Sequence, residues 1–496
     1  MAQLTPSRAL NLRAVLLLFA ALTLPVSGQG LPDLGDASSA SLSEQQEKTI
    51  GNRIMREVRT DPAYLDDPEV TDYIRSLGNR LLASSENPRT GLEFFMVNDE
   101  QINAFALVGG HIGIHTGLFA LTQSEAELAG VVAHEIAHIT QRHQARSIHG
   151  QRSSQWTSLA ALALAVLASR SSSSQSGQIT EAALASASAL AIQSQLDYTR
   201  EHEREADRVG LVTLERAGLD PRGMSAFFER MLRANRLAEF KSAPSYLRTH
   251  PLTIERIADM QDRIERMPSR LVPDSFDYRI ARARVRASIG SATEAVKAAN
   301  LQLEDKTVVR LREDVYQLAV AQRRAREFDA AWKTLAPLRE GPGARQPAFE
   351  LLAARLETDL GKQDDALATY KAALATSPNY RALVYGRLEL LLDRGRPREV
   401  LSDLEERLRN VSDDWRLYEI QARAYEAVGN NVARHRAQAE AFYRRGNLGA
   451  AVDQLELASK QKGSNFYESS IVESRLRELR TLLETEREAE KAMKIS

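Results

Sequence analysis

The sequence predicts a mainly α-helical protein, in which an α+β domain with a small sheet is followed by an all-α solenoid of helical repeats. Eight of the nine histidines lie before residue 270, in a stretch of mixed helix and strand patterns. From residue 271 onward the chain reads as one helix after another, and glycines recur at 361, 395 and 429. This spacing of 34 residues is the period of the tetratricopeptide repeat. We therefore expect three segments, namely a signal peptide over residues 1–28, a first domain over 29–270 and a repeat domain over 271–496.

The composition of the 496-residue chain excludes several kinds of site. Lys and Arg total 65 against 66 Asp and Glu, a formal net charge of −1, so nothing in the charge favours a nucleic-acid partner. The absence of cysteine excludes disulfides, a thiolate nucleophile, an iron–sulfur cluster and a cysteine-ligated zinc site. Any metal must therefore be bound by His, Asp or Glu side chains.

The first 28 residues have the pattern of a secretory signal. Arg8 and Arg13 precede an apolar run over residues 14–24, and small residues follow up to Gly28, where a signal peptidase would cut. The run is too short to span a bilayer by itself, and an uncleaved N-terminal anchor is the alternative. An exported protein without disulfides fits the bacterial periplasm, so we expect a periplasmic protein.

The repeats are clearest over residues 361–380. Ala366, Tyr370, Ala373 and Pro378 fall on the small, aromatic, small and proline positions of the second helix of a tetratricopeptide repeat. Alanines one turn apart let paired helices approach closely, and proline ends the helix before the next repeat. Stacked repeats form a concave surface for a peptide or a partner protein. An irregular helical bundle is the alternative interpretation.

A metal-binding signature lies within residues 131–149. His134, Glu135 and His138 form an H-E-x-x-H motif in a run that is compatible with a helix. Residues i and i+4 share one face of a helix, so both histidines can bind a single Zn²⁺. Glu135 points to a different side and can act as general base toward a water molecule. The alternative is a helix with two surface histidines that bind no metal.

A zinc hydrolase needs a third protein ligand and an open position for water. Gln141 and Gln144 stand where the extended metzincin signature has glycine and histidine, so that class is excluded. Glu203 and Asp207 are again four residues apart on a predicted helix. Glu203 can bind zinc, while Asp207 accepts a hydrogen bond from a ligand imidazole and fixes its tautomer. The competing acids are expected to form solvent-facing ion pairs with arginines of the same helix: Glu201 and Glu205 with Arg200, Arg204 and Arg208.

Together these motifs resemble those of the M48 metallopeptidases. The resemblance rests on HEIAH, on E-x-x-A-D within residues 200–210, on the segment 103–110, and on the Thr-His-Pro triplet at 249–251 ahead of Arg-Ile at 256–257. With a signal peptide ahead and repeats behind, the chain is most similar to periplasmic members of the family. The resemblance implies a zincin-like metalloprotease domain over residues 29–270, with zinc on His134, His138 and Glu203 and general-base catalysis by Glu135.

The resemblance also implies a role for His250. In similar periplasmic members a histidine at the matching position can approach the metal from a loop, occupy the water position and hold the enzyme latent. A fourth side-chain ligand would remove the site at which water is activated. His250 could instead donate to the oxyanion of the tetrahedral intermediate, or could only cap the turn at Pro251.

Residues 109–116 (GGHIGIHT) alternate in the manner of a strand, which we expect at the edge of the sheet over the active-site cleft. An unpaired edge near zinc would bind a substrate by adding its extended backbone to the sheet. Cleavage would then be broad in sequence but restricted to unfolded segments. His111 and His115 are expected to line this cleft without binding zinc. The remaining histidines of this half are expected to be exposed helix residues: His143, His149 and His202.

An insertion rich in small residues, 158–196, lies between the two predicted zinc-binding helices. Apolar runs over 158–169 and 180–196 flank a serine-rich stretch at 171–177. Each apolar run is too short to span a membrane. A helical hairpin that covers the cleft, or that contacts a membrane or a membrane-protein client, accounts for this composition, and so does an ordinary helical core.

The sequence therefore predicts a zinc-dependent endopeptidase with one Zn²⁺ per chain, in which Glu135 takes a proton from water and returns it to the leaving amine. The resemblance implies a latent periplasmic enzyme that degrades unfolded or misassembled outer-membrane proteins and docks onto the outer-membrane assembly machinery through its repeats. The alternative is a chaperone or adaptor in which the repeats do the main work and the zinc site is mostly silent. Peripheral membrane contact is compatible with both functions, whereas nucleic acid is not an expected partner.

Overall fold

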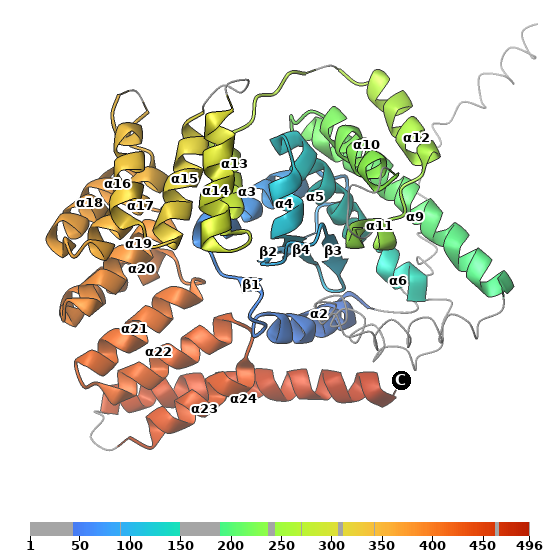
Figure 1. The fold of residues 1–496 in the computed structure, drawn as a ribbon. Helices are drawn as coiled ribbons and strands as arrows, with labels where there is room; N and C mark the ends of the chain where they lie inside the picture. The colour runs from blue at the N-terminus through green and yellow to red at the C-terminus, as the bar shows by residue number, and fades with distance from the viewer. Residues whose placement is uncertain are drawn as a thin grey trace, which may run out of the picture.

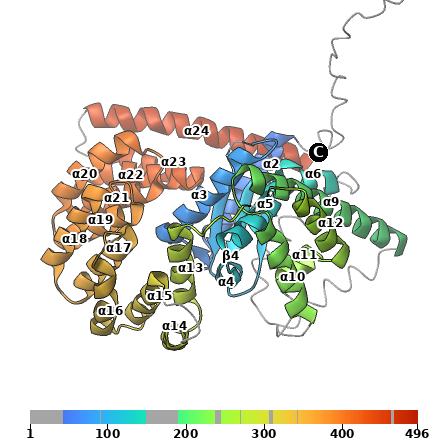
Figure 2. The same cartoon turned by 90° about the horizontal axis from the view of Figure 1, so that it is seen from above.

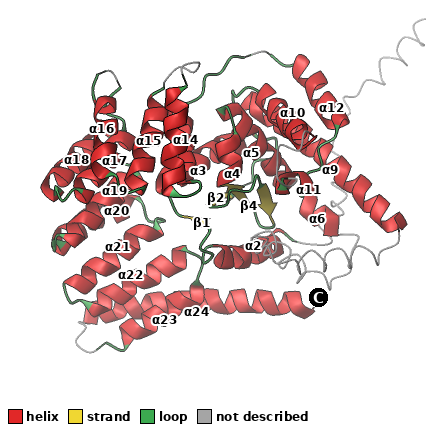
Figure 3. Cartoon of the chain, in the orientation of Figure 1, coloured by secondary structure: helices red, strands yellow, loops and turns green. Residues whose placement is uncertain are grey.

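The computed structural model describes residues 43–89, 91–148, 189–236, 244–268, 270–305, 311–341, 343–461 and 466–495. The expected signal peptide lies outside these residues, as do His149 and most of the insertion at 158–196. The predicted fold class is confirmed, because the described chain is mainly helical, with one small sheet in its first half and a helical solenoid in its second (Figures 1 and 3). Within the described residues, no helix has both the length and the apolar composition that crossing a bilayer requires.

The sheet has four strands in the order β1-β2-β4-β3. They are β1 (Tyr64–Leu65), β2 (Glu93–Val97), β3 (Ala104–Leu107) and β4 (His111–His115). β2 and β4 are parallel, whereas β1 and β3 run antiparallel to their neighbours. Within the described sheet, β3 therefore forms one edge and the short β1 forms the other.

The expectation that residues 109–116 form an edge strand is wrong, because β4 pairs with β2 on one side and with β3 on the other. All five residues of β4 are buried. Gly113 allows close packing, since a Cβ at this position would lie 2.6 Å from the ring of Phe105 and 2.8 Å from that of Phe95. The small residues of this stretch thus mark a crowded central strand, and β3 takes the place of the predicted edge.

The sheet separates two hydrophobic clusters, because successive side chains of a strand point to opposite faces. Phe94 and Met96 of β2 belong to the larger cluster, with α3 (Pro68–Ser84), α4 (Thr116–Leu121), α5 (Glu125–Thr140), α9 (Ala189–Arg216) and α10 (Arg222–Arg236). Phe95 and Val97 face the smaller cluster, which α2 (Glu44–Val58) covers. Three shorter helices complete this half: α6 (His143–Ile148), α11 (Ser245–Thr249) and α12 (Ile254–Glu265).

Helix α5 lies at the centre of the larger cluster, and nearly all of its residues are buried. Ser124 caps its start by accepting a hydrogen bond from the backbone N–H of Glu127. Two glycines let its neighbours approach closely. A Cβ on Gly130 would lie 2.7 Å from Met224 of α10, and one on Gly210 of α9 would lie 3.4 Å from the backbone nitrogen of His134. Helix α9 is thereby held against α5, which brings the Glu203 motif beside the H-E-x-x-H motif.

The second half is a curved stack of helices that pack side by side (Figure 1). The 3-10 helix η3 (Ala336–Arg339) follows α16, and the α-helices of the stack are α13 (Phe276–Ser288), α14 (Ala292–Glu304), α15 (Arg312–Arg324), α16 (Phe328–Leu335), α17 (Pro347–Asp359), α18 (Gln363–Thr376), α19 (Arg381–Asp393), α20 (Pro397–Asn410), α21 (Trp415–Ala427), α22 (Asn431–Arg444), α23 (Leu448–Ser459) and α24 (Phe466–Ile495).

The glycines at the 34-residue spacing occupy equivalent turns of this stack. Gly361, Gly395 and Gly429 lie between the helices of the pairs α17/α18, α19/α20 and α21/α22, with φ of 78°, 68° and 80°. Residues that carry a side chain rarely adopt this left-handed backbone conformation, which explains why glycine recurs in these turns. The helix pairs match the expected tetratricopeptide period, and the assignment to that repeat class stays a prediction.

The solenoid contacts the first half through α3, α4 and α2 (Figures 1 and 2). At α3, the carboxylate of Glu69 lies 2.9 Å from Arg284 of α13 and 3.0 Å from Arg355 of α17. At the far end of the solenoid, α24 runs back to α2, where Arg56 pairs with Glu486. The charged contacts at α3 are nearly closed to solvent, so they hold the solenoid in a defined orientation relative to the sheet.

Helix α13 belongs to both packing units. Tyr278 is part of the larger cluster beside the sheet, whereas Ile280 belongs to a cluster within the solenoid. The predicted division between residues 270 and 271 thus falls just ahead of a helix that both halves share. The domain limits themselves stay a prediction.

Candidate metal centre

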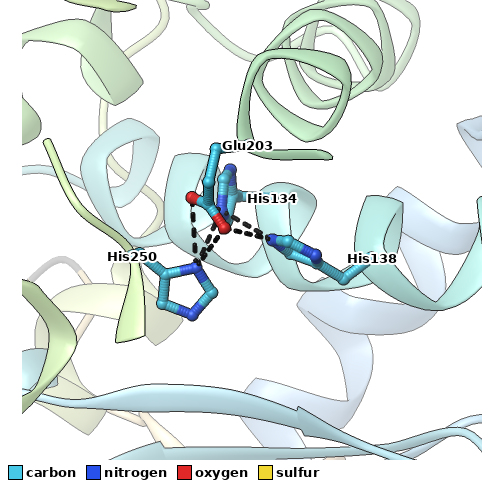
Figure 4. Close-up of side chains that lie close together, drawn as sticks. All are labelled: His134, His138, Glu203 and His250. Carbon is cyan, nitrogen blue, oxygen red and sulfur yellow. Dashed lines mark hydrogen bonds and ion pairs between the residues drawn. The ribbon is translucent and has the colours of Figure 1, made fainter. Parts of the chain in front are cut away.

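Four side chains that can bind a metal meet between α5 and α9 (Figure 4). His134 and His138 come from successive turns of α5, Glu203 comes from α9, and His250 directly follows α11. His134, Glu203 and His250 are buried, and the side chain of His138 is 11% exposed. The structure thus places together all four residues for which the sequence predicts metal binding.

The donor atoms are spaced like the ligands of one small cation. His134 Nε2 lies 3.0 Å from His138 Nε2 and 3.3 Å from His250 Nδ1. The oxygens of Glu203 lie 3.3 Å from each of the two Nε2 atoms and 3.1 Å from His250 Nδ1. With zinc–ligand bonds of about 2.0–2.1 Å, a tetrahedron separates its donors by about 3.3 Å. These separations are close to those of a tetrahedral Zn²⁺ site, and all the donor atoms lie within 4.8 Å of one another.

Glu135 lies beside this group without joining it. Its carboxylate is buried, and neither oxygen has a hydrogen-bond partner among the described residues. The ring of His250 approaches it on the side away from the donor group, with Nε2 at 3.5 Å from Glu135 Oε1. Because a buried carboxylate without partners is costly, its retention points to a functional role.

Asp207 lies beside His134, at the contact that the sequence predicts. Its Oδ1 lies 3.0 Å from His134 Nδ1, on the side of the ring away from the ligand group. Arg256 of α12 holds both acids, because its Nη1 lies 2.9 Å from Glu203 and its Nε donates to Asp207 at 2.7 Å. Arg256 belongs to the family pattern in the sequence, but its contact with the two acids depends on how α12 packs against α9, which the sequence does not reveal.

Charge at the centre follows from these contacts. Burial by itself would raise the pKa of Glu203, but the charge of His250 and hydrogen bonds from His134 and His138 hold that pKa well below its usual range. Burial would also raise the pKa of Asp207, and hydrogen bonds from His134 and Arg256 outweigh it and lower the pKa. For His134, burial would lower the pKa, but Asp207 and Glu203 raise it to about 9. A metal at this centre therefore competes with a proton on His134.

Two of the histidines predicted to be exposed are buried, so that expectation is wrong. His143 and His202 are 2% and 6% exposed, and their rings stack at a centroid distance of 4.2 Å. The chain reverses at Arg142, whose φ is 53°, and this reversal carries α6 back beneath His138. The hydrophobic periodicity of the sequence does not reveal that His143 and His202 are buried, because their burial follows from this turn and not from the helix pattern.

The expected pairing of Glu205 with arginines of its own helix is also wrong. Its carboxylate accepts a hydrogen bond from Arg146 of α6 at 2.6 Å and lies 3.1 Å from His143 Nε2. Glu201 is exposed, as expected. The difference arises because α6 packs on the face of α9 that carries Glu205, while Glu201 lies on the solvent side.

His111 and His115 do not belong to the ligand group that the described residues form. Both rings are buried within the sheet region, and the expectation that they line the cleft stays a prediction. His111 Nδ1 lies 3.1 Å from Glu93, and the His115 ring packs edge-on against Phe105 at 5.9 Å.

The outer edge of β3 is occupied at both ends. The odd-numbered residues of β3 pair with β4, as the bond from the His115 N–H to the carbonyl of residue 103 shows, so even-numbered residues turn their backbone outward. The outward carbonyl of Ile102 accepts from the backbone N–H of Tyr246 in α11 at 3.1 Å. The outward carbonyl of Ala106 accepts from Gln144 Nε2 in α6 at 2.5 Å.

Tyr246 links that edge to the ligand group. Its ring stacks on the ring of His250 at a centroid distance of 4.6 Å, and its carbonyl accepts from the His250 N–H at 2.8 Å. Tyr246 is fully buried. The short helix α11 thus contacts both the sheet edge and the metal centre.

Comparison with known proteins agrees with this geometry. The pattern of Peptidase family M48 matches residues 68–264. The chain is 34% identical to the beta-barrel assembly-enhancing protease of Escherichia coli (strain K12), over 92% of this chain and 93% of that protein. It is 32% identical to the protein of the same name from Yersinia pestis, over 93% and 94% of the two chains. The mitochondrial metalloendopeptidase OMA1 of Schizosaccharomyces pombe is 29% identical over 39% of this chain and 52% of its own.

Proposed function

Because the chain belongs to peptidase family M48 and is a zinc metalloendopeptidase, we propose that it acts in the periplasm as a latent quality-control protease for outer-membrane β-barrel proteins. The observation that carries the proposal is the buried tetrahedral donor group with the unpartnered carboxylate of Glu135 beside it. The client class is supported by the names of the two beta-barrel assembly-enhancing proteases, which align along nearly their whole length. A disulfide-free chain with a signal-like N-terminus supports the location.

In this proposal His134, His138 and Glu203 hold the zinc, and Asp207 orients His134. Bound zinc supplies a Lewis acid that polarises the scissile carbonyl and acidifies water. Glu135 accepts the proton of the attacking water and passes it to the leaving amine. Its buried oxygens have no hydrogen-bond partner among the described residues, and Oε1 lies 3.5 Å from His250 Nε2. Withdrawal of His250 would leave both oxygens open to that water and then to the amine.

His250 keeps the resting enzyme latent. Its Nδ1 completes the tetrahedral donor group, and this is the position that water must occupy in an active zinc peptidase. Its Nε2 also lies 3.5 Å from Glu135, so the same ring stands between the base and the metal position. Activation requires His250 to move away, and α11 is the element that must carry it.

Substrate binds at the edge strand β3 in an extended conformation. An added strand would pair with the outward backbone groups of β3 and read main chain in preference to side chains. In the resting protein Tyr246 and Gln144 already use two of these groups. Movement of α11 would therefore release the Ile102 carbonyl for substrate as it withdraws His250 from the metal.

The second candidate function is that of a chaperone or adaptor for outer-membrane protein assembly. The specific observation in its favour is that His250 lies within the donor group, since a fourth side-chain ligand would close the resting site to water. The helix pairs of the solenoid would then perform the chaperone or adaptor function, by binding the assembly machinery or client proteins. Both activities can reside in one chain, and we place proteolysis first.

The test uses an unfolded outer-membrane β-barrel protein as substrate for the purified, zinc-loaded chain. Glu135→Gln should lose about 10²–10⁴-fold in cleavage rate while retaining its zinc, because it removes the general base alone. Glu201→Gln, which changes an exposed acid of α9, is the matched control and should cleave like wild type. Retained cleavage by Glu135→Gln would contradict the mechanism.

A complementation experiment separates the two candidate functions. In cells that lack the chain, wild type should restore outer-membrane integrity and Glu135→Gln should restore it only in part. Full rescue by Glu135→Gln would favour the chaperone or adaptor. Cleavage by wild type of folded and unfolded β-barrel protein at equal rates would argue against quality control as the function.

A further inference from the structure

The two zinc-binding histidines of α5 are oriented by different partners. His134 directs its Nδ1 toward the carboxylate of Asp207, the usual arrangement for a metal-bound imidazole. His138 directs its Nδ1 toward another imidazole, with 2.9 Å between its Nδ1 and the Nδ1 of His143. One of these two nitrogens must donate and the other must accept, so the contact has a direction.

The direction is set on the far side of His143. Its Nε2 lies 3.1 Å from Glu205 Oε2, an oxygen that also accepts from Arg146 at 2.6 Å. A carboxylate can only accept, so Nε2 of His143 carries the proton and Nδ1 of the neutral ring is left as an acceptor. The opposite arrangement would place two acceptors 3.1 Å apart.

The direction of this contact determines which nitrogen of His138 can bind a metal. Because His143 Nδ1 accepts, Nδ1 of His138 must carry the proton, and Nε2 of His138 keeps a free lone pair. That Nε2 is the atom that lies 3.0 Å from His134 Nε2 and 3.3 Å from Glu203 Oε1, inside the ligand group. A reversed proton order would put hydrogen on the atom that must bind the cation.

We propose that His143 is a positioning residue for the zinc site, which selects the metal-binding tautomer of His138 through the chain Arg146–Glu205–His143–His138. The inference deepens the proposed function and rests on it, since it takes His138 as a zinc ligand. The geometry is well constrained: His143 is 2% exposed and its ring lies parallel to that of His202, with an interplanar angle of 4°. The reversal at Arg142 places the ring there.

Two amide variants separate this role from simple packing. His143→Asn keeps an acceptor near the place of Nδ1 and loses the donor to Glu205. His143→Gln keeps a donor near the place of Nε2 and loses the acceptor for His138. If His143 orients His138, zinc affinity falls about 10-fold or more in His143→Gln and His143→Ala and stays within about 3-fold of wild type in His143→Asn. If His143 only packs and pairs with Glu205, the order of the two amide variants is reversed.

Zinc affinity is measured by competition with a chromophoric chelator, and the thermal unfolding midpoint of each metal-free variant shows whether it is folded. His435→Gln is the control, because His435 is a buried histidine of the solenoid that bonds to Gln454, and its zinc affinity should match wild type. Wild-type affinity in His143→Gln would overturn the proposal. If His143→Gln does not fold, Glu205→Gln serves instead. A neutral amide no longer imposes the direction, so weaker zinc binding supports the proposal and unchanged binding overturns it.

His138→Ala distinguishes failure of the relay from failure of the proposed ligand set. Wild-type zinc affinity in His138→Ala would overturn the ligand set and the relay together. Lost affinity in His138→Ala, combined with wild-type affinity in His143→Gln and His143→Ala, would overturn the relay alone.

Discussion

Arg256 holds Asp207 through two parallel hydrogen bonds, from Nε to Oδ2 at 2.7 Å and from Nη2 to Oδ1 at 2.8 Å, and both side chains are buried. Asp207 in turn lies 3.0 Å from His134. The contact that we propose to orient His134 therefore depends on a cation from a different helix, α12. Because a charge-assisted bidentate pair is both strong and directional, Arg256 limits how far Asp207 can rotate.

Arg256→Met should weaken zinc binding by roughly 10–100-fold, the usual effect of losing a group that orients a metal ligand. The metal-free protein should also lose about 3–5 kcal/mol of stability, because Asp207 and Glu203 lose their buried cation. Chelator competition and thermal unfolding measure the two effects. Arg263→Met is the control on the same helix, since Arg263 pairs with Asp259 at the surface. Equal behaviour of the two variants would refute the role of Arg256.

His250→Ala should raise the rate at which an unfolded peptide is cleaved. Removal of the fourth side-chain ligand leaves the water position open, and a closed state that is favoured by as little as about 1.4 kcal/mol corresponds to a tenfold gain. The assay needs saturating zinc, because the variant has one ligand fewer. Glu135→Gln/His250→Ala should be inactive. A lower rate in His250→Ala would instead identify His250 as a donor to the oxyanion.

Gln144→Ala should lower KM for extended peptides by about fivefold and leave kcat unchanged, since a net hydrogen bond is worth about 1 kcal/mol. The reason is that Gln144 Nε2 uses the outward carbonyl of Ala106, which an added substrate strand would need. Gln363→Ala, in the solenoid, should leave KM unchanged. A rise in KM would mean that Gln144 contacts the substrate directly.

Glu93 should make stability depend on acid pH. Burial by itself would raise its pKa, but the hydrogen bond from His111 and the charge and hydrogen bonds of Arg59 lower the pKa to about 2. Because this value lies below the ordinary pKa of 4.5, the ionised carboxylate stabilises the fold at neutral pH. That contribution, on the order of 2–3 kcal/mol, falls as the pH drops from about 5 toward 2.

The measurement compares thermal midpoints of metal-free wild type and Glu93→Gln. The variant should melt clearly lower at pH 7, and roughly half or more of the difference should be gone at pH 3. Glu44→Gln is the control, because Glu44 pairs with Arg89 while its side chain is 76% exposed. A difference that stays constant between pH 7 and pH 3 would exclude Glu93 as the source.

Local sequence patterns are sufficient to predict most residues of the candidate site. His134 and His138 are presented together by helical spacing alone, and Glu203 with Asp207 repeats that spacing on a second helix. Such i, i+4 relations are fixed by helix geometry and need no knowledge of the fold. The glycine period of the solenoid is local in the same sense. Each of these glycines is needed because the turn in which it lies requires a positive φ.

The errors arose where packing overrides a pattern. Alternation in residues 109–116 suggested an edge, but strand order depends on which strands pair, and β4 pairs on both sides. His143 was expected to be an exposed helix residue, but the turn at Arg142 folds it beneath His138. Neither outcome can be read from residues close in sequence.

The sequence by itself determined which residues are candidates for the chemistry of this protein, because the absence of cysteine and the spacing of two helical motifs single out His134, His138 and Glu203 as the proposed zinc ligands. Only the tertiary structure decided how those ligands are held. Arg256 reaches Asp207 from α12, His143 reaches His138 from α6, and α11 spans from His250 to the edge of β3. The rules of helix and strand geometry act over short sequence distances and do not bring these segments together. The packing of α9 and α12 against α5 and the sheet does so.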